Sequence, residues 1–251
     1  MSQPWTSILV MWSDAQVNDC LYPGTVAESM TPASGAAAPS ALTLRFATFF
    51  DQDEDLRLLT PAARRVLAVA AALFFRSGAL TVSVRQLTKA CGLSPGALYN
   101  HFQSRDDLLF VLVHNGHVRT ERKLARALDG VDGDPRQGLD RFVRAYVEVH
   151  VSFPEYAQLV HREYVHLDDP RRAEIVEIRR RMRDRLVTIV RDGEEHGAFH
   201  LLGGRDAAVS HATMILDMCG RTSEWFNPAQ HSPELADRYV AAALRVVGAR
   251  F

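Results

Sequence analysis

Much that would define other kinds of protein is missing from this chain of 251 residues. Its three cysteines are far apart and form neither a CxxC pair nor a metal-finger spacing, so a disulfide framework is not expected. No apolar run reaches the roughly 18 residues that a membrane span needs. The apolar patch at residues 8–12 follows no basic residue and is too short for a secretory signal. We therefore expect a cytoplasmic protein with no membrane partner.

Motifs of the common enzyme classes are also missing. The sequence contains no GxSxG, HExxH, Walker loop or GxGxxG. A metal site is not expected, because His161 and His166 do not share a helical face, although Glu163 and His166 do. We predict that the chain is not an enzyme and needs no cofactor. An enzyme that binds a small molecule stays as an alternative class.

The net charge of −1 is unevenly distributed along the chain. Residues 1–58 carry a net charge of −5, residues 59–107 carry +4, and the remainder is neutral. A basic block between an acidic segment and a neutral body favours a module that binds a polyanion. A solvated helix face without a partner is the alternative explanation.

Composition divides the chain into three parts. Residues 31–41 are rich in Ala, Ser and Pro and lack bulky apolar groups. Residues 1–56 are therefore expected to be a largely disordered extension, with a short helix near residues 42–50. A true start later than Met1 is a second explanation of this extension. Residues 57–107 are expected to form a small helical module, and residues 108–251 a larger helical body.

Helix signals are dense from Thr60 onward. Five times a capping side chain precedes a proline, whose missing N–H and fixed φ suit the first helical position, at residues 60–61, 94–95, 134–135, 169–170 and 232–233. No comparable strand pattern occurs, so the expected fold is all-α. The expected helices span residues 61–77, 83–90, 94–101, 104–128, 135–152, 154–167, 170–196, 204–226 and 233–249.

The segment at residues 81–102, TVSVRQLTKACGLSPGALYNHF, carries the clearest functional signal. A short helix capped by Ser83 is followed by Gly92, which permits a left-handed turn, and Ser94 restarts the chain as a second helix. Leu98 and Phe102, four residues apart, form the buried face of that helix. Two short helices with so tight a turn predict a helix-turn-helix, with an ordinary helical hairpin as the alternative.

The second helix suits a DNA groove. Gly96 and Ala97 near its start are small enough to let it enter the major groove closely. Its free N-terminal amides favour a phosphate or an acceptor-rich base edge. Tyr99, Asn100 and His101 have donors of the right length for backbone phosphates.

Residues 61–113 resemble the DNA-binding domain of TetR-type transcriptional regulators. The resemblance rests on AALFF at 71–75 with Gly78, TVSVR at 81–85, GLSPGALYNHF at 92–102 and SRDDLL at 104–109. Two features depart from the family pattern. Thr88 stands where alanine is usual against the partner helix, and the acidic segment at residues 51–55 stands where the family often has a basic arm.

The resemblance implies a role for each matching position and a double-stranded DNA operator as the partner. Phosphate contacts are expected from Ser83, Tyr99, His101 and Arg105, and major-groove contacts from Arg85, Ser94, Pro95, Gly96, Ala97 and Asn100. A homodimer would place two such helices about 34–36 Å apart on a near-palindrome. Because the second helix has few side chains that read bases, Arg85 is predicted to carry specificity.

Residues 104–251 resemble the C-terminal domains of the same family less closely, and three stretches are similar to the subgroup that senses acyl-CoA. These stretches lie at residues 162–172, 225–228 and 235–239. Helices at 204–226 and 233–249 alternate small and large residues, which favours a four-helix bundle in a homodimer, with a monomer core as the alternative. The residues expected to bind a small-molecule effector are Phe142, Tyr146, Arg162, Tyr164, Met214, Met218 and Trp225.

Together these features predict a ligand-responsive regulator of transcription with no metal site. The resemblance implies a repressor released from a palindromic operator by a hydrophobic small molecule, with an acyl-CoA of lipid or sterol catabolism as the candidate. The alternative is a helical protein-interaction module without specific DNA binding. A steep salt dependence of DNA binding would distinguish the two.

Overall fold

The computed structural model describes residues 38–131, 133–227 and 234–249. These residues form helices joined by turns, with no strand among them, which confirms the all-α prediction. The short 3-10 helices are η1 (Leu56–Leu58), η2 (Ala79–Thr81), η3 (Tyr164–His166) and η4 (Arg205–Ala207). The α-helices are α2 (Ala41–Gln52), α3 (Pro61–Ser77), α4 (Val84–Cys91), α5 (Pro95–Tyr99), α6 (Arg105–Leu128), α7 (Pro135–Ser152), α8 (Pro154–Glu163), α9 (Asp169–Glu195), α10 (Ala208–Gly220), α11 (Thr222–Trp225) and α12 (Leu235–Val246).

Helix starts follow the predicted capping rule. The side chains of Thr60, Ser94 and Asp134 accept backbone N–H groups in the first turns of α3, α5 and α7. The cap of α9 differs from the prediction by one position, because Asp168 rather than Asp169 accepts the N–H of the first turn. The predicted start at residues 232–233 lies outside the described residues.

Residues 38–56 belong to the folded protein, which corrects the expectation of disorder up to residue 56, whereas α2 confirms the short helix expected near residues 42–50. α2 packs against α3 and buries Phe46 and Phe50 completely. The ring centroid of Phe46 lies 4.6 Å from that of Phe153, and the centroid of Phe49 lies 5.4 Å from that of Tyr156. This aromatic cluster holds α2 against the start of α8. Residues 1–37 lie outside the described residues.

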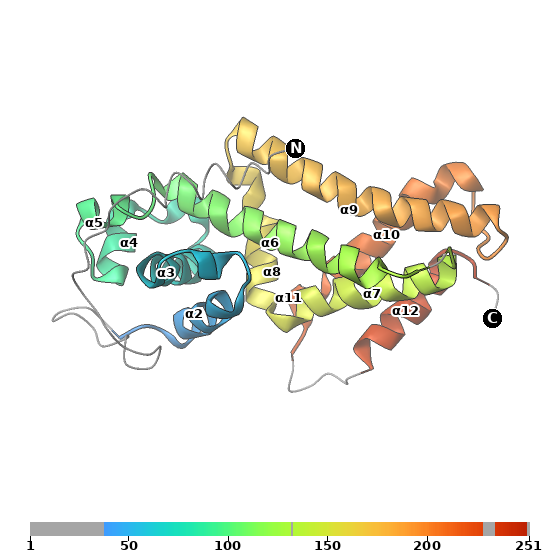
Figure 1. Cartoon of the computed structure of the whole chain (residues 1–251), viewed down its shortest axis with the longest axis horizontal. Helices are drawn as coiled ribbons and strands as arrows, with labels where there is room; N and C mark the ends of the chain where they lie inside the picture. Colours follow the sequence, from blue (N-terminus) through green and yellow to red (C-terminus); the bar gives the residue numbers. More distant parts are fainter. Residues whose placement is uncertain (1–37, 132, 228–233, 250–251) are drawn as a thin grey trace. The chain divides into compact units, whose positions relative to one another are not determined.

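α6 connects the two helical groups of the fold. Figure 1 shows α3, α4 and α5 together at the N-terminal end of α6 and α7 beside its other end. The buried side of α6 changes character along its length. Leu108 and Leu112 are fully buried near the first group, whereas His114, Asn115 and His117 are buried in the middle of the helix. Buried polar groups need hydrogen-bond partners, so the middle of α6 depends on polar groups supplied by neighbouring elements.

The helices predicted at residues 204–226 and 233–249 differ from the prediction in two ways. The first is interrupted, and both bury within this chain residues that were expected to face a second subunit. The expected helix at 204–226 is divided into η4, α10 and α11. Ala212, Ile215 and Ala243, assigned from sequence to a bundle between subunits, lie buried in the core of this single chain. The other side of α10 leaves Val209 and Met214 exposed. No helix in the described part of the chain combines the length and the apolar character that crossing a membrane requires.

Candidate DNA-binding surface and ligand cavity

The predicted helix-turn-helix is present as α4 and α5. Ser83 and Gln86 form a reciprocal capping box at the start of α4. Gly92 ends α4 with a φ of +67°, a left-handed conformation that a side chain would resist. α5 is shorter than expected, because its helical residues end at Tyr99. Leu98 and Phe102 are buried, as predicted, and fix α5 to the domain.

The residues predicted to contact DNA lie on one local surface around α4, α5 and the start of α6. Ala97, His101 and Arg105 are half-buried. Arg105 donates two hydrogen bonds to Asp106, so reaching a phosphate requires it to leave that carboxylate. The exposed members are Ser83, Arg85, Ser94, Pro95, Gly96, Tyr99 and Asn100.

Contacts within the chain do not require glycine at position 96 or arginine at position 85. A Cβ added at Gly96 would meet nothing within 4 Å, and glycine inside a helix costs about 1 kcal/mol relative to alanine. Arg85 is exposed, and its side chain makes no hydrogen bond or ion pair with any described residue. Gly96 therefore leaves room for a close approach to α5, and Arg85 is available to an external anion or base edge.

Thr88 fits the position where alanine was expected. It is buried, and its hydroxyl donates to the carbonyl oxygen of Arg85 in its own helix. Its remaining surface therefore presents a methyl group to the domain core. The departure from the family pattern changes neither the fold nor the exposed surface.

The acidic segment at residues 51–55 binds arginines of the protein itself. Asp53 is buried, and its Oδ1 accepts hydrogen bonds from Asn115 and from the backbone N–H groups of Asp55 and Leu56. Glu54 pairs with Arg122 and Arg126 of α6, and these guanidinium groups lower the pKa of Glu54. The segment thus connects the chain before α3 to α6. Its acidic side chains bind α6, in contrast to the basic arm that the family often has at this position.

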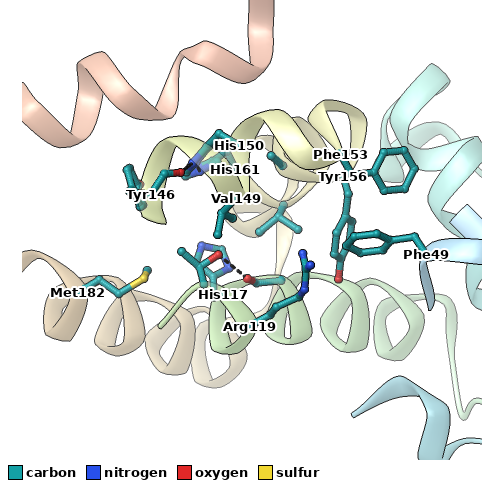
Figure 2. Close-up of a pocket in the computed structure, with 14 residues that line it drawn as sticks. Phe49, His117, Arg119, Tyr146, Val149, His150, Phe153, Tyr156, His161 and Met182 are labelled. Atoms are coloured by element: carbon teal, nitrogen blue, oxygen red, sulfur yellow. Dashed lines mark hydrogen bonds between the residues drawn. The ribbon is translucent and has the colours of Figure 1, made fainter. Parts of the chain in front are cut away.

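A small cavity lies at the middle of α6, between α7 and α8. Its volume is about 30 Å³, close to the space of a water molecule. Figure 2 shows His117, His150, His161 and Tyr146 on one side of this cavity and Phe49, Phe153 and Tyr156 on the other. The cavity therefore has a polar end and an aromatic end.

The three histidines form two hydrogen-bonded branches that meet at Arg179 of α9. In one branch, Nη1 of Arg179 lies 3.2 Å from Nδ1 of His161, and Nε2 of His161 lies 2.7 Å from Nε2 of His150. Nδ1 of His150 lies 2.7 Å from the carbonyl oxygen of Tyr146. In the other, Nη1 of Arg179 lies 3.4 Å from Nε2 of His117, whose Nδ1 lies 2.8 Å from the carbonyl oxygen of Val113. If Arg179 donates to both rings, one set of neutral imidazole tautomers satisfies both branches.

Burial keeps these histidines uncharged. It lowers the pKa of His117 to about 3 and the pKa of His150 to about 4. The pKa of His161 falls well below 6.5, first through burial and then through its proximity to His150 and His117. At neutral pH the positive charge in this cluster therefore belongs to Arg179.

A larger cleft adjoins the aromatic end of the cavity. Its volume is about 750 Å³, and Phe49 and Arg119 line both spaces. Three acidic residues line the cleft, Asp53, Glu54 and Glu148, against six basic ones. The basic residues are Arg119, Arg122, Lys123, Arg126, Arg141 and Arg144. The cleft is therefore wide and rich in arginine, and three further carboxylates, those of Asp55, Asp140 and Asp237, pair with Arg122 and Arg144.

The structure brings few of the sequence-predicted ligand residues to the cavity. Tyr146 lines it, and Phe142 is buried with its ring centroid 6.0 Å from that of Tyr146. Tyr164 lies under Arg179, whose Cζ is 4.7 Å from the ring centroid. Met214, Met218 and Trp225 of α10 and α11 are not among the lining residues of either space.

Arg162 has a structural partner rather than a place in the cavity. Its Nη2 donates to the carbonyl oxygens of Phe74 and Phe75, at the end of α3, and its Nε donates to Glu163. Glu163 is buried and also accepts the N–H of Ala79. These two residues therefore connect the end of α8 to the DNA-binding helices.

Sequence reasoning did not bring these cavity residues together, because they come from four different helices. His117, His150 and His161 belong to α6, α7 and α8, and Arg179 to α9, so no local spacing links them. Among the described residues no group of three or more potential ligands is placed to hold a metal ion. His161 and Glu163 face different partners, as the bonds above show.

A helix-turn-helix with an exposed polar surface, joined by one helix to a body that contains a cavity, is the architecture expected of a DNA-binding regulator. Comparisons with known proteins agree. Residues 66–112 match the family model for bacterial regulatory proteins of the tetR family. Residues 132–247 match the model for the tetracyclin repressor-like C-terminal domain.

The HTH-type transcriptional regulator UidR of Escherichia coli K12 is 31% identical over 101 residues, which are 40% of this chain and 49% of that protein. The chain thus spans about half the length of the curated relatives it matches. A tetR-family regulatory protein from Rhodococcus RHA1 has a similar structure, with a TM-score of 0.69 and 28% identity over 76% of this chain and all of that one.

The structure of AibR in complex with isovaleryl coenzyme A and operator DNA shares the fold, with a TM-score of 0.64, 20% identity, and coverage of 75% of this chain and 100% of that chain. This chain belongs to the TetR family of transcriptional regulators. Members of that family are transcription factors rather than enzymes, which confirms the prediction made from the missing motifs. Both family matches begin after α2, so this helix lies outside the matched residues.

Proposed function

We propose that this protein is a cytoplasmic repressor that binds a palindromic operator as a homodimer and is released by a small-molecule effector. The observation that carries the DNA-binding part is the surface of α4 and α5. It combines an exposed, unpaired Arg85 with a helical glycine that has open space around it. A partner that approaches closely would fill the space at Gly96 and supply a hydrogen-bond acceptor for Arg85.

DNA binding is tested by fluorescence anisotropy with the region upstream of the protein's own gene and with random duplexes. Wild-type protein should prefer one upstream site, with an affinity that falls steeply with salt. R85A should lose about 1–3 kcal/mol at that site and much less on random DNA. R180A, on the exposed side of α9, is the control and should leave both affinities unchanged. Equal loss of R85A binding to both DNAs contradicts the role of Arg85.

The homodimer would form through the exposed sides of α10 and the residues that follow it. Met214 is 52% exposed and Val209 is 42% exposed, although both are apolar. Trp225 is 45% exposed and stacks on Tyr239 of α12, with ring centroids 6.4 Å apart. Burying such side chains against a second copy is favourable by about 25 cal/mol per Å². Sedimentation should show a dimer at micromolar concentration for wild type and a monomer for M214E.

The effector would be a hydrophobic molecule with an anionic part, and an acyl-CoA remains the candidate class. The aromatic end of the cavity would take an apolar group, and the arginines of the cleft beside it would take phosphates. The cleft's ion pairs are partly exposed, so a ligand could share their arginines at little cost. The acyl-CoA complex of AibR supports this class by likeness of fold.

Release from DNA would follow from a shift of α6. His117 in the cavity wall and Arg105 at the DNA surface lie on this helix, about 18 Å apart along its axis at 1.5 Å per residue. The cavity of about 30 Å³ would have to open to take a larger ligand, and a shift of α6 relative to α7 and α8 would open it. It acts as an effector only if it prefers one spacing of the two DNA-binding surfaces.

Native mass spectrometry of the purified protein identifies a co-purified effector. The same compound, added to the operator complex, should lower the affinity for the operator and leave binding to random DNA little changed. A compound that binds the protein without changing operator affinity is not the effector.

A further inference from the structure

Arg179 places a positive charge behind the wall of the ligand cavity. Arg179 is half-buried and forms no ion pair with an acidic side chain of the described residues. Its neighbours on α9 differ: Arg180 pairs with Glu177 and Asp184, and Arg181 pairs with Glu121. A cation withdrawn from water without a counter-ion is costly.

The groups around Arg179 cannot supply that counter-ion. Its two hydrogen-bond partners are imidazole nitrogens, 3.2 Å and 3.4 Å away, and its planar face lies against the ring of Tyr164. Imidazole accepts a hydrogen bond but carries no negative charge. The guanidinium uses Nη1 in these contacts, so Nε and Nη2 have no hydrogen bond with a described residue.

The two imidazoles that contact Arg179 are themselves walls of the cavity. His117 and His161 both line it, and Met182, one helical turn after Arg179, lines it as well. The positive charge therefore stands directly behind the polar end of a space of about 30 Å³. A carboxylate group is of a size that this end could take after a small displacement of the side chains.

We propose that the buried end of the effector is a carboxylate that lies beside His117 and His161 and uses Arg179 as its counter-ion and hydrogen-bond donor. This inference rests on the proposed ligand-responsive function. It changes the expected ligand from one with a plain hydrocarbon end to one with an acidic end. Either a free carboxylic acid or a CoA thioester of a dicarboxylic acid provides that chemistry.

Two matched pairs of probes test the proposal by calorimetry on the full chain without DNA. The free-acid pair is hexanoate and hexanamide, which differ in charge at one end. The thioester pair is adipoyl-CoA and hexanoyl-CoA, which differ in a terminal carboxylate. The proposal predicts that the charged member of at least one pair binds more tightly, and the pair that responds identifies the source of the carboxylate.

Variants at α9 assign the effect to Arg179. R179Q should weaken binding of the charged probe by about 10- to 100-fold, the loss expected for a charge-assisted hydrogen bond, and leave the neutral probe unchanged. R179K should retain part of the affinity because it keeps the charge. R180Q is the control, since Arg180 is exposed and paired with acids on its own helix.

Side-chain NMR signals of the histidines provide a second readout. The charged probe should shift the imidazole signals of His117 and His161 in wild type and not in R179Q. Binding of the charged and neutral members with equal affinity in both pairs, no binding of any probe, or unchanged binding to R179Q overturns the proposal. Operator binding by the ligand-free protein is measured separately, so loss of the carboxylate site leaves the proposed DNA-binding function standing, and absence of operator binding removes that function.

Discussion

Replacing Asp53 tests whether the segment before α3 contributes to the stability of the folded protein. The carboxylate is 6% exposed, and a single oxygen, Oδ1, accepts from Asn115 Nδ2 at 2.9 Å and from the N–H groups of Asp55 and Leu56 at 3.1 Å and 3.0 Å. D53A leaves three donors without this acceptor. At about 1–1.7 kcal/mol for each, the free energy of unfolding should fall by about 3–5 kcal/mol.

The expected change in melting temperature follows from that loss. About 2–4 °C per kcal/mol for a domain of this size gives a decrease of about 6–20 °C for D53A, measured by circular dichroism. D53N keeps an oxygen acceptor and loses only the charge that faces Arg119, 3.6 Å away, so it should melt much closer to wild type. E54Q removes only exposed ion pairs and should lower the melting temperature far less than D53A does. A D53A protein that melts within about 2 °C of wild type would show that this segment contributes nothing to the fold.

Three further predictions follow from the site. G96A should fold at least as stably as wild type, since its Cβ meets nothing within 4 Å, yet it should bind the operator more weakly in anisotropy titrations; unchanged affinity would place α5 away from the DNA. Y156F removes a buried hydroxyl that donates to Asn115 and to a backbone carbonyl of α6, so urea unfolding should show a loss of about 1–2 kcal/mol, and no loss would refute this contact. Because burial lowers the pKa of His117 to about 3 and of His150 to about 4, the unfolded chain takes up protons first as the pH falls below about 6.5. Each of these histidines should then cost up to about 2 kcal/mol of stability by about pH 5, and melting temperatures that stay constant down to that pH would contradict their burial.

Local signals in the sequence were sufficient for most helices. Caps followed by proline placed the starts of α3 and α7 at the observed residues, because both signals act within one turn. They failed at α9 by one residue, where two adjacent aspartates can each cap and the chain uses Asp168. Breaks inside long helices, such as the one between α10 and α11, depend on packing and leave no comparable signal.

The segment before α3 shows what local reasoning misses. The low-complexity stretch at residues 31–41 suggested disorder, but the aromatic residues after it find partners about 100 positions away in the chain. Phe46 and Phe49 pack on Phe153 and Tyr156, and these contacts exist only in the folded protein. Acidic residues that looked like a departure from the family pattern are the ones that bind α6.

The residues of the ligand cavity could not be grouped from the sequence as those of the helix-turn-helix could. The residues expected to contact DNA are close in sequence, so one motif groups them. The polar cavity wall takes one histidine from each of three helices, and Arg179 lies behind it on a fourth. Arg162, selected because it interrupts an apolar helix, instead binds the end of α3.

The central claim is that the surface of α4 and α5 recognises a specific duplex. A competition titration measures this most directly: labelled upstream DNA bound to the full-length protein is challenged with the unlabelled site or with random duplex, at several salt concentrations. The account predicts that the unlabelled site competes at far lower concentration than random DNA, and that the logarithm of the affinity falls linearly with the logarithm of salt concentration. Equal competition by both duplexes at every salt concentration would contradict it.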